Sequence, residues 1–187
     1  NSESLGDIID AGAGIYDEVD YSALSSAVSV TLNGNNFVNV IINSVNDHQI
    51  RNVENVTGGL GADFIVGDAN DNTLVGNAGN DTLFGELGDD TFEATSLTDG
   101  SDFIDGGSSS ESNGDTIDYS KILRITDGTT GGITVDLKDQ DGTSTATVVV
   151  NSGNNDTIDN IENVFGTQNN DTIYGNDTKN TLYGNSG

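Results

Sequence analysis

Residues 58–66 read GGLGADFIV, and they begin a run of four nonapeptides that follow one another without a gap. The next three begin at Gly67, Gly76 and Gly85, so each starts one nonapeptide after the one before. All four have Gly at position 1, Asp or Asn at position 6 and an apolar residue at position 8. Four periods in one phase are typical of a repeat protein that stacks short, similar units.

The composition, taken without this periodicity, is that of a disordered chain. The 187 residues carry a formal net charge of -26, from 31 acidic residues against 5 basic ones, and only 33% of them are hydrophobic. Strong self-repulsion with so few apolar residues usually keeps a chain unfolded. The apolar residues are nevertheless placed periodically, which a disordered tail has no reason to do. We therefore expect bound cations to remove the repulsion and to complete the fold.

The charge also limits the partners. Nucleic-acid phosphates and anionic membrane surfaces would both be repelled, so we predict no nucleic-acid partner. No apolar run approaches the ~20 residues of a membrane span, and we predict none. The chain begins at Asn1 without Met and stops four positions into a repeat, so we expect a piece of a longer protein. It has no Cys, so disulfides cannot stabilise it.

A longer repeat is superimposed on the nonapeptides. The sequence NVENV at residues 52–56 returns as NIENV at residues 160–164, which is a shift of twelve nonapeptides. Gly58 returns as Gly166 at the same shift. Upstream, the motif that contains Tyr21 returns around Tyr119 at a shorter shift, so the two copies differ in length between these anchors. The extra length falls in less regular segments that alternate apolar and polar residues, as strands do.

These patterns predict an all-β chain of two units that form one continuous solenoid. No window shows the periodicity of an amphipathic helix. The predicted units are residues 1–105, with the irregular β segment 22–49, and residues 106–187, a truncated copy with the irregular β segment 120–157.

The motifs resemble those of the RTX, or haemolysin-type, calcium-binding family of secreted bacterial proteins. The clear similarity covers residues 50–105 and 160–187. The resemblance implies a right-handed parallel β-roll, which is a β-helix or solenoid of Gly/Asp-rich nonapeptides with two nonapeptides per turn. It also implies several Ca2+ ions between successive layers, and export of the parent protein by a type I secretion apparatus.

The residue types at these spacings suit calcium. Ca2+ takes six to eight oxygen ligands at roughly 2.3–2.6 Å, and carbonyls and carboxylates both serve. Gly at positions 1, 2 and 4 permits positive φ angles, which would turn carbonyl oxygens toward one point. Position 6 would supply the carboxylate. The predicted ligand residues are Gly58, Leu60, Gly61, Asp63, Asn72, Gly76, Ala78, Gly79, Asp81, Gly85, Leu87, Gly88, Asp90, Asp102, Asp115 and Asp171.

Stacking at a period of two nonapeptides adds two further acids. It would place Asp63 under Asp81, so that two carboxylates clamp one ion. It would also place Glu54 in the layer below Asn72, and Glu162 occupies the equivalent position in the second copy. We infer that Glu54 and Glu162 supply the negative charge that the neighbouring Asn side chains lack.

Position 8 should form the core, and position 9 should face outward. The predicted core column consists of Ile65, Leu74, Leu83, Phe92, Ile173 and Leu182. Outward aromatic residues at position 9, such as Phe84, could stack on sugars, but they more often pack against neighbouring strands. His48 is the only histidine and is expected in an ordinary loop. No nucleophile, base or cofactor motif is present, so we predict no enzymatic activity.

The expected function is a calcium-binding structural module. It would belong to a large secreted or cell-surface protein of a Gram-negative bacterium, such as an adhesin, a toxin or an exoenzyme, and would fold on exposure to external calcium. An alternative is a recognition module that binds polysaccharide or a cell surface through residues 22–49 and 120–157. A further alternative is a non-catalytic module of a secreted enzyme.

Overall fold

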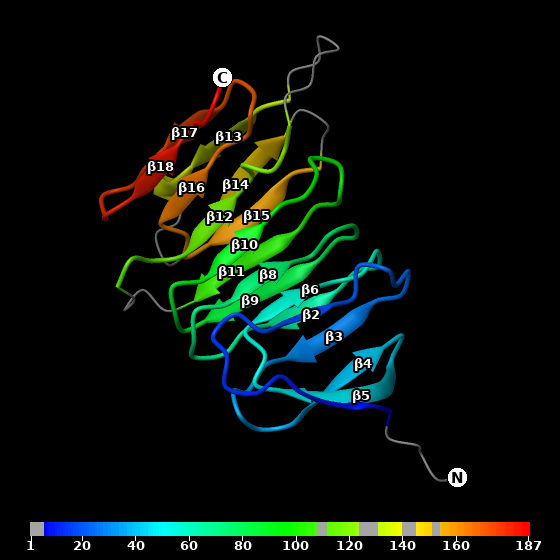
Figure 1. The fold of residues 1–187 in the computed structure, drawn as a ribbon. Coiled ribbons are helices and arrows are strands. Elements are labelled where there is room, and N and C mark those ends of the chain that lie inside the picture. The colour runs from blue at the N-terminus through cyan, green and yellow to red at the C-terminus, as the bar shows by residue number, and fades with distance from the viewer. Residues whose placement is uncertain (1–5, 108–111, 124–130, 140–144, 151–153) are drawn as a thin grey trace.

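The chain forms two β-sheets that face each other along a solenoid (Figure 1). The computed structural model describes residues 6–107, 112–123, 131–139, 145–150 and 154–187. These residues contain eighteen β-strands and one short 3-10 helix, η1 (Leu137–Asp139). No helix in these ranges is long and apolar enough to cross a membrane. The prediction of an all-β roll is confirmed.

The sheets differ in size. The eleven-stranded sheet has the spatial order β1 (Ile8–Asp10), β5 (Val45–Arg51), β4 (Val38–Ile42), β3 (Val28–Thr31), β7 (Phe64–Val66), β9 (Thr82–Glu86), β11 (Phe103–Gly107), β15 (Asp156–Asp159), β14 (Ala146–Val150), β13 (Ile133–Asp136) and β17 (Thr172–Tyr174). The seven-stranded sheet has the order β18 (Thr181–Tyr183), β16 (Asn163–Phe165), β12 (Thr116–Asp118), β10 (Thr91–Glu93), β8 (Thr73–Val75), β6 (Asn55–Thr57) and β2 (Glu18–Asp20).

Successive nonapeptides alternate between the two sheets. In the eleven-stranded sheet β7 pairs with β9 in parallel, and Ile65 lies opposite Leu83. In the seven-stranded sheet β8 pairs with β10, and Leu74 lies opposite Phe92. In both pairs the partners are two nonapeptides apart along the chain, so one turn of the roll contains two nonapeptides, as expected. Each repeat ends in a short strand centred on the apolar position 8, and Gly-rich turns connect these strands.

The irregular segments depart from this parallel arrangement. The strands β3, β4 and β5 form an antiparallel meander inside the eleven-stranded sheet, and β13, β14 and β15 form a second one. The turn between β4 and β5 consists of Asn43 and Ser44, with φ angles of 51° and 66°. Two positive φ angles suit a tight hairpin turn that matches the strand twist. The sequence predicted strands here, but it did not predict their antiparallel pairing.

The apolar residues at position 8 fill the space between the sheets. Ile65, Leu74, Leu83 and Phe92 are at most 3% exposed, which confirms the predicted core column. Ile173 is only partly buried, and Leu182 is 40% exposed, so the prediction for Leu182 is wrong. The physical reason is that β18 is the last strand of its sheet, so no further layer of this chain covers Leu182.

Candidate metal centre

A column of acids runs along the start of four strands of the eleven-stranded sheet. Asp63, Asp81, Asp102 and Asp156 lie in successive layers, and each backbone N–H donates to the next acid. The N–O distances are 2.7 Å from Asp63 to Asp81 Oδ1, 2.8 Å from Asp81 to Asp102 Oδ1, and 3.1 Å from Asp102 to Asp156 Oδ1. The position-6 acids are therefore stacked in successive layers. The two-nonapeptide period indicated this for Asp63 and Asp81, whereas Asp102 and Asp156 join the column at longer separations of 21 and 54 residues.

A second column lies at the start of strands of the seven-stranded sheet. The N–H of Asn72 donates to Asp90 Oδ1 at 2.7 Å, and the N–H of Asp90 donates to Asp115 Oδ1 at 2.8 Å. The N–H of Asp115 in turn donates to Glu162 Oε2 at 2.9 Å. The structure thus brings four more of the predicted site residues into one line.

Glu54 and Glu162 meet their Asn neighbours in an unexpected way. The Asn72 Nδ2 group donates to the backbone oxygen of Glu54 at 2.9 Å, while the Glu54 carboxylate accepts the N–H of Asp17 at 3.0 Å. Glu162 repeats this arrangement with Asn180 and Asp115. The side chain of Glu54 points toward the layer that precedes it, and Asn72 lies in the layer that follows it. The Glu54 carboxylate therefore faces away from Asn72. In this structure the expected charge compensation is not made by the Glu side chains.

Asp171 stands apart from both columns. Its Oδ1 accepts the N–H of Ile133 at 2.9 Å, just as Asp63 Oδ1 accepts the N–H of Val28 at 2.7 Å in the first copy. The antiparallel strands β14 and β13 lie between β15 and β17, so Asp171 does not stack on Asp156.

Glycine at position 1 has a different role from the expected one. Gly76 and Gly85 do not have positive φ angles, so that expectation is wrong at position 1. A Cβ atom on Gly76 would instead lie 2.4 Å from Asp81 Oδ2, and one on Gly85 would lie 2.2 Å from Asp90 Oδ2. Position 1 is therefore glycine because the position-6 carboxylate of the same repeat lies against its Cα.

Two glycines at position 4, Gly79 and Gly88, have the expected positive φ angle, whereas Gly61 does not. The φ angles of Gly79 and Gly88 are 139° and 124°. A Cβ atom on Gly79 would lie 2.4 Å from the carbonyl oxygen of Gly61 in the layer before, so stacked turns touch through their backbones. The turn residues Gly58, Leu60, Gly61 and Ala78 lie in the same stack, and Leu60 and Leu87 are 55% and 48% exposed.

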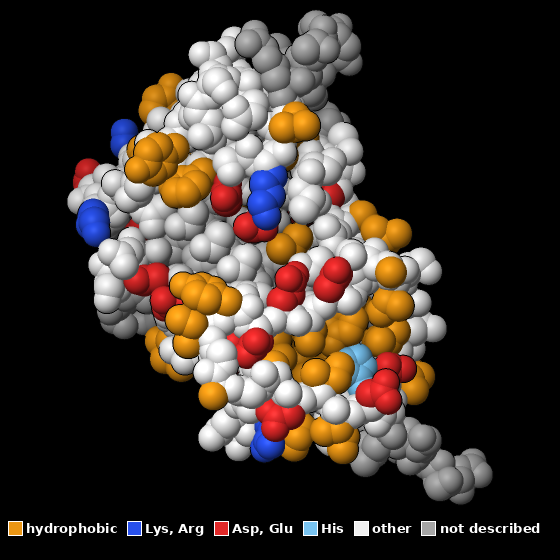
Figure 2. Space-filling view, in the orientation of Figure 1, with side chains coloured by type: hydrophobic (Ala, Val, Ile, Leu, Met, Phe, Trp, Pro, Cys, Tyr) orange, Lys and Arg blue, Asp and Glu red, His pale blue; other side chains and the backbone are white. Residues whose placement is uncertain are grey.

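Within the described ranges, Asp63, Asp81, Asp102 and Asp156 make no ion pair with a basic side chain. Burial raises the pKa of Asp81 to about 7, helped by repulsion from Asp63, Asp99 and Asp156. Among the described residues the ion pairs join Arg51 to Asp10 and Lys121 to Glu93, and His48 Nδ1 contacts Asp47 Oδ2 at 2.9 Å. Figure 2 likewise shows acidic side chains spread over one face with few Lys or Arg among them. The ion pairs of the described residues thus bring no basic side chain to this column.

The donor set fits a hard cation that accepts both carboxylate and carbonyl oxygens. The buried Oδ2 atoms of Asp81 and Asp171 have no hydrogen-bond donor among the described residues. A buried carboxylate oxygen without a partner is costly, and a cation would remove that cost. In the described ranges no three His, Cys, Asp or Glu side chains converge on one metal position. Backbone carbonyls would therefore have to complete the coordination, as they do for Ca2+.

Residues 57–92 and 159–187 match a family model, the RTX calcium-binding nonapeptide repeat, in four copies. These segments are RTX repeats. Proteins with RTX repeats bind calcium through them and are typically secreted by bacteria, and the repeat is generally structural rather than catalytic. A comparison with curated proteins finds no match. The RTX match covers both stretches in which the sequence motifs are most regular.

Two tyrosines that the sequence did not assign to the site are buried and make polar contacts near the acid columns. Tyr119 is 1% exposed, and its hydroxyl donates to Asp156 Oδ2 at 2.6 Å. In the first copy Tyr21 makes the equivalent contact, at 2.8 Å, with His48 Nε2. His48 lies in β5 and is 9% exposed, so its expected loop position is wrong. The sequence did contain a signal for the equivalence of these two contacts, because His48 and Asp156 are related by the same twelve-nonapeptide shift as the NVENV motif.

Removal of the two buried hydroxyls is expected to have unequal effects. Tyr119→Phe should lower the free energy of unfolding by about 2 kcal/mol, because it takes a donor from a buried carboxylate. Tyr21→Phe should cost about 1 kcal/mol, because its acceptor is an imidazole that keeps its contact with Asp47. Urea unfolding at pH 8 in excess calcium measures both. An equal or larger loss for Tyr21→Phe would contradict this assignment.

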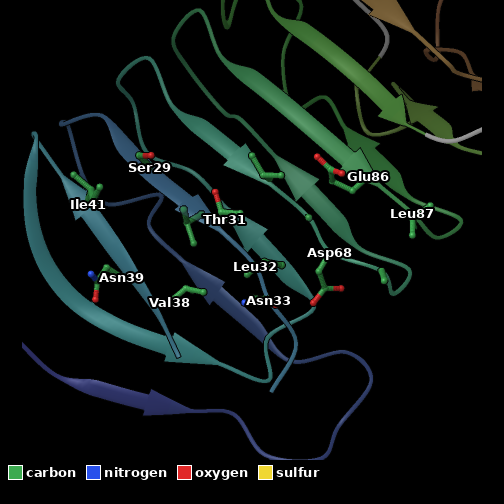
Figure 3. Close-up of a pocket in the computed structure, with 14 residues that line it drawn as sticks. Ser29, Thr31, Leu32, Asn33, Val38, Asn39, Ile41, Asp68, Glu86 and Leu87 are labelled. Carbon is green, nitrogen blue, oxygen red and sulfur yellow. The ribbon is translucent and has the colours of Figure 1, made fainter. Parts of the chain in front are cut away.

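A groove in the first irregular segment is a second candidate site. β3 and β4 pair only at Val28–Ile42 and Ser29–Ile41, and beyond these pairs the strands diverge. The space between them is a groove of about 720 Å³ (Figure 3). Asn33, Asn39 and Asp68 lie on its wall beside apolar side chains. A groove with this mixture could take a polar ligand with an apolar face.

Proposed function

We propose that this chain is a calcium-loaded structural module of a larger secreted or cell-surface bacterial protein. The observation that carries the proposal is the buried stack of Asp63 on Asp81, which makes no ion pair among the described residues and lies in a segment that matches the RTX repeat. The predicted turn residues and acids, from Gly58 to Asp171, would hold several Ca2+ ions between layers. Residues 1–105 and 106–187 would form one continuous solenoid. We assign no catalytic role to any residue.

The same chemistry supports a folding switch outside the cell. Without calcium, a net charge of -26 favours an expanded chain, and an expanded chain suits export through a type I secretion apparatus. External calcium would then bind and drive folding, since the free energy of metal binding is here largely free energy of folding. A Gram-negative source and a parent protein such as an adhesin, a toxin or a secreted enzyme agree with this route.

The test is a calcium titration of the full chain, starting in chelator, followed by far-UV circular dichroism and calorimetry. We expect a cooperative gain of β signal at a stoichiometry of several ions per chain, with no such gain in magnesium at the same concentration. Mg2+ prefers six near-octahedral ligands and keeps its water, so it should not close these turns. A β spectrum already complete in chelator would contradict the proposal.

Recognition is a second candidate function, and the groove between β3 and β4 favours it. Its polar residues Asn33, Asn39 and Asp68 could bind sugar hydroxyls of a polysaccharide or a cell surface. Residues 124–130, 140–144 and 151–153 of the second irregular segment lie outside the described part of the chain. A glycan array tests this candidate: loss of binding on Asn39→Ala would support it, and no binding to any glycan would refute it.

A further inference from the structure

A row of alternating hydroxyl and aromatic side chains crosses the outer face of the eleven-stranded sheet. The register of the parallel strands places one residue of each strand in this row, and its members in order are Ser29, Phe64, Thr82, Phe103 and Thr157. Each of them adjoins a buried core residue in its strand, so each points away from the core. Neighbouring strands are about 4.8 Å apart, so the row follows the axis of the roll with one side chain per layer.

Phe84 joins two of these side chains into an aromatic ladder. It lies in the neighbouring register row, where it pairs with Val66 and Asp105. Its ring centroid is 5.9 Å from that of Phe64 and 5.8 Å from that of Phe103. Phe64 is 43% exposed and the other two rings are half-buried, so part of the ladder faces solvent. Contiguous apolar groups on an outward face are typical of a binding surface.

The ladder continues into the groove between β3 and β4. Val66 pairs with Phe84 and also lines the groove, and Glu86 follows Phe84 on the same face of β9 and lines it as well. Thr31 on β3 and Asn39 on β4 lie on the groove wall (Figure 3). Thr31 in turn pairs with Val66. The groove and the ladder therefore form one continuous surface that extends along the roll.

The chemistry of this surface suits a sugar chain. A sugar ring presents C–H groups on its two faces and hydroxyls at its edge, so it can stack on an aromatic ring while polar side chains bind its hydroxyls. The row offers both in turn, because Thr82 lies between Phe64 and Phe103. The pattern extends over several layers, so it fits a polymer that lies along the roll better than a single sugar.

The charges around this surface select the class of polysaccharide. Asp68 and Glu86 line the groove, and Asp105 lies beside Phe84 in its register row. No Lys or Arg is among the described residues that line the groove. These acids would repel a chain of uronic acids or sulfated sugars, whereas they do not repel an uncharged chain. The row itself contains no charged residue, which favours a neutral ligand over a basic peptide.

We propose that the groove and the aromatic ladder bind a neutral, extended polysaccharide that lies along the axis of the roll. This inference rests on the recognition function proposed above and names its ligand class. Phe64, Phe84 and Phe103 stack on the faces of successive sugars, while Thr82 and Asn39 bind hydroxyls. The stacked layers hold the rings in line before the ligand arrives, so little ordering is needed on binding.

Affinity electrophoresis of the full, calcium-bound chain tests the proposal. The gels contain one of three neutral probes, hydroxyethylcellulose, galactomannan or mixed-linkage β-glucan, or carboxymethylcellulose as the anionic counterpart of the first. We expect at least one neutral probe to retard the chain and carboxymethylcellulose not to retard it. Phe64→Ala should raise the dissociation constant for the neutral probe by about tenfold or more, because a ring that the sugar would cover is lost.

Tyr183→Ala is the matched control. Tyr183 is also an exposed ring, 55% exposed, and it also packs against an aromatic partner, Phe165, at a centroid distance of 4.9 Å. It lies in the seven-stranded sheet, away from the ladder, so its removal should leave the dissociation constant unchanged. Circular dichroism in excess calcium reports whether Phe64→Ala folds. If it does not, Phe64→Leu, which keeps an apolar side chain without a ring, is measured instead, and the same weakening or its absence decides.

The outcomes separate this inference from the proposals on which it rests. Failure of all three neutral probes, equal retardation by carboxymethylcellulose, or equal effects of Phe64→Ala and Tyr183→Ala would overturn it. Binding that is lost in Asn39→Ala but kept in Phe64→Ala would also overturn the ladder, while recognition by the groove would stand. A β spectrum already complete in chelator would overturn the calcium switch alone, because electrophoresis measures only binding.

Discussion

Raising the pH of the calcium-free chain from about 4 to about 8 is expected to abolish its β signal. The pKa values of Asp81 and Asp102 are raised from 3.8 to about 7 in the folded chain, mainly by burial. The folded state therefore binds more protons than the unfolded state between these values. Stability is fully present below the unfolded pKa and is lost as the pH rises through the folded pKa. The combined loss is on the order of a few kcal/mol, which is a large share of the stability of a small domain.

Calcium should invert the dependence of folding stability on pH. Protons and Ca2+ compete for the same carboxylates, so calcium-bound chain should be most stable above pH 7 and lose its ions in acid. Circular dichroism across pH 4–9, with chelator and then with excess calcium, measures both curves. Two parallel curves, or a chelated chain that gains β signal with rising pH, would show that the buried acids do not control folding.

Alanine at Gly85 is expected to lower the free energy of unfolding by about 3 kcal/mol or more, even in excess calcium. A Cβ atom there would lie 2.2 Å from Asp90 Oδ2 and 2.5 Å from the carbonyl oxygen of Gly106. Neither atom can move freely, since Asp90 belongs to the acid column and Gly106 to the stacked backbone of the next layer. The substitution should also weaken calcium binding, because the carboxylate of Asp90 must leave its position.

Gly184 offers a matched control for this substitution. It holds the same repeat position as Gly85, but a Cβ atom on it would meet nothing within 4 Å. Gly184→Ala should therefore change stability by less than about 0.5 kcal/mol. Urea unfolding of the two variants and the wild type gives the comparison. Similar losses for both variants would mean that backbone entropy, rather than the close carboxylate, explains glycine at position 1.

The regular part of the roll could be derived from the sequence. The nonapeptide phase fixes which residues point inward, and Ile65 opposite Leu83 follows from it. The stack of Asp63 on Asp81 follows in the same way. These features are local and repeat without interruption, so each turn sets the register of the next. The strong negative charge and the scarcity of basic residues also predicted that cations must take part in folding.

Other features depended on contacts that no local pattern encodes. The antiparallel meanders arise because β4 and β14 pair with their neighbours through hairpins, which gives no periodic signal. The side-chain direction of Glu54 depends on the layer that precedes it.

The sequence by itself determined the nine-residue period and the inward column, because these follow from spacing along the chain. The roll with two nonapeptides per turn was implied by the resemblance to the RTX family, and the participation of cations was expected from the charge. Only the tertiary structure brought Asp156 to the acid column and gave Tyr119 its buried partner. Asp102 and Asp156 are 54 residues apart, and an irregular segment of different length separates them from the repeat phase. Their contact is set by how the layers stack in space, so it could not be counted along the chain.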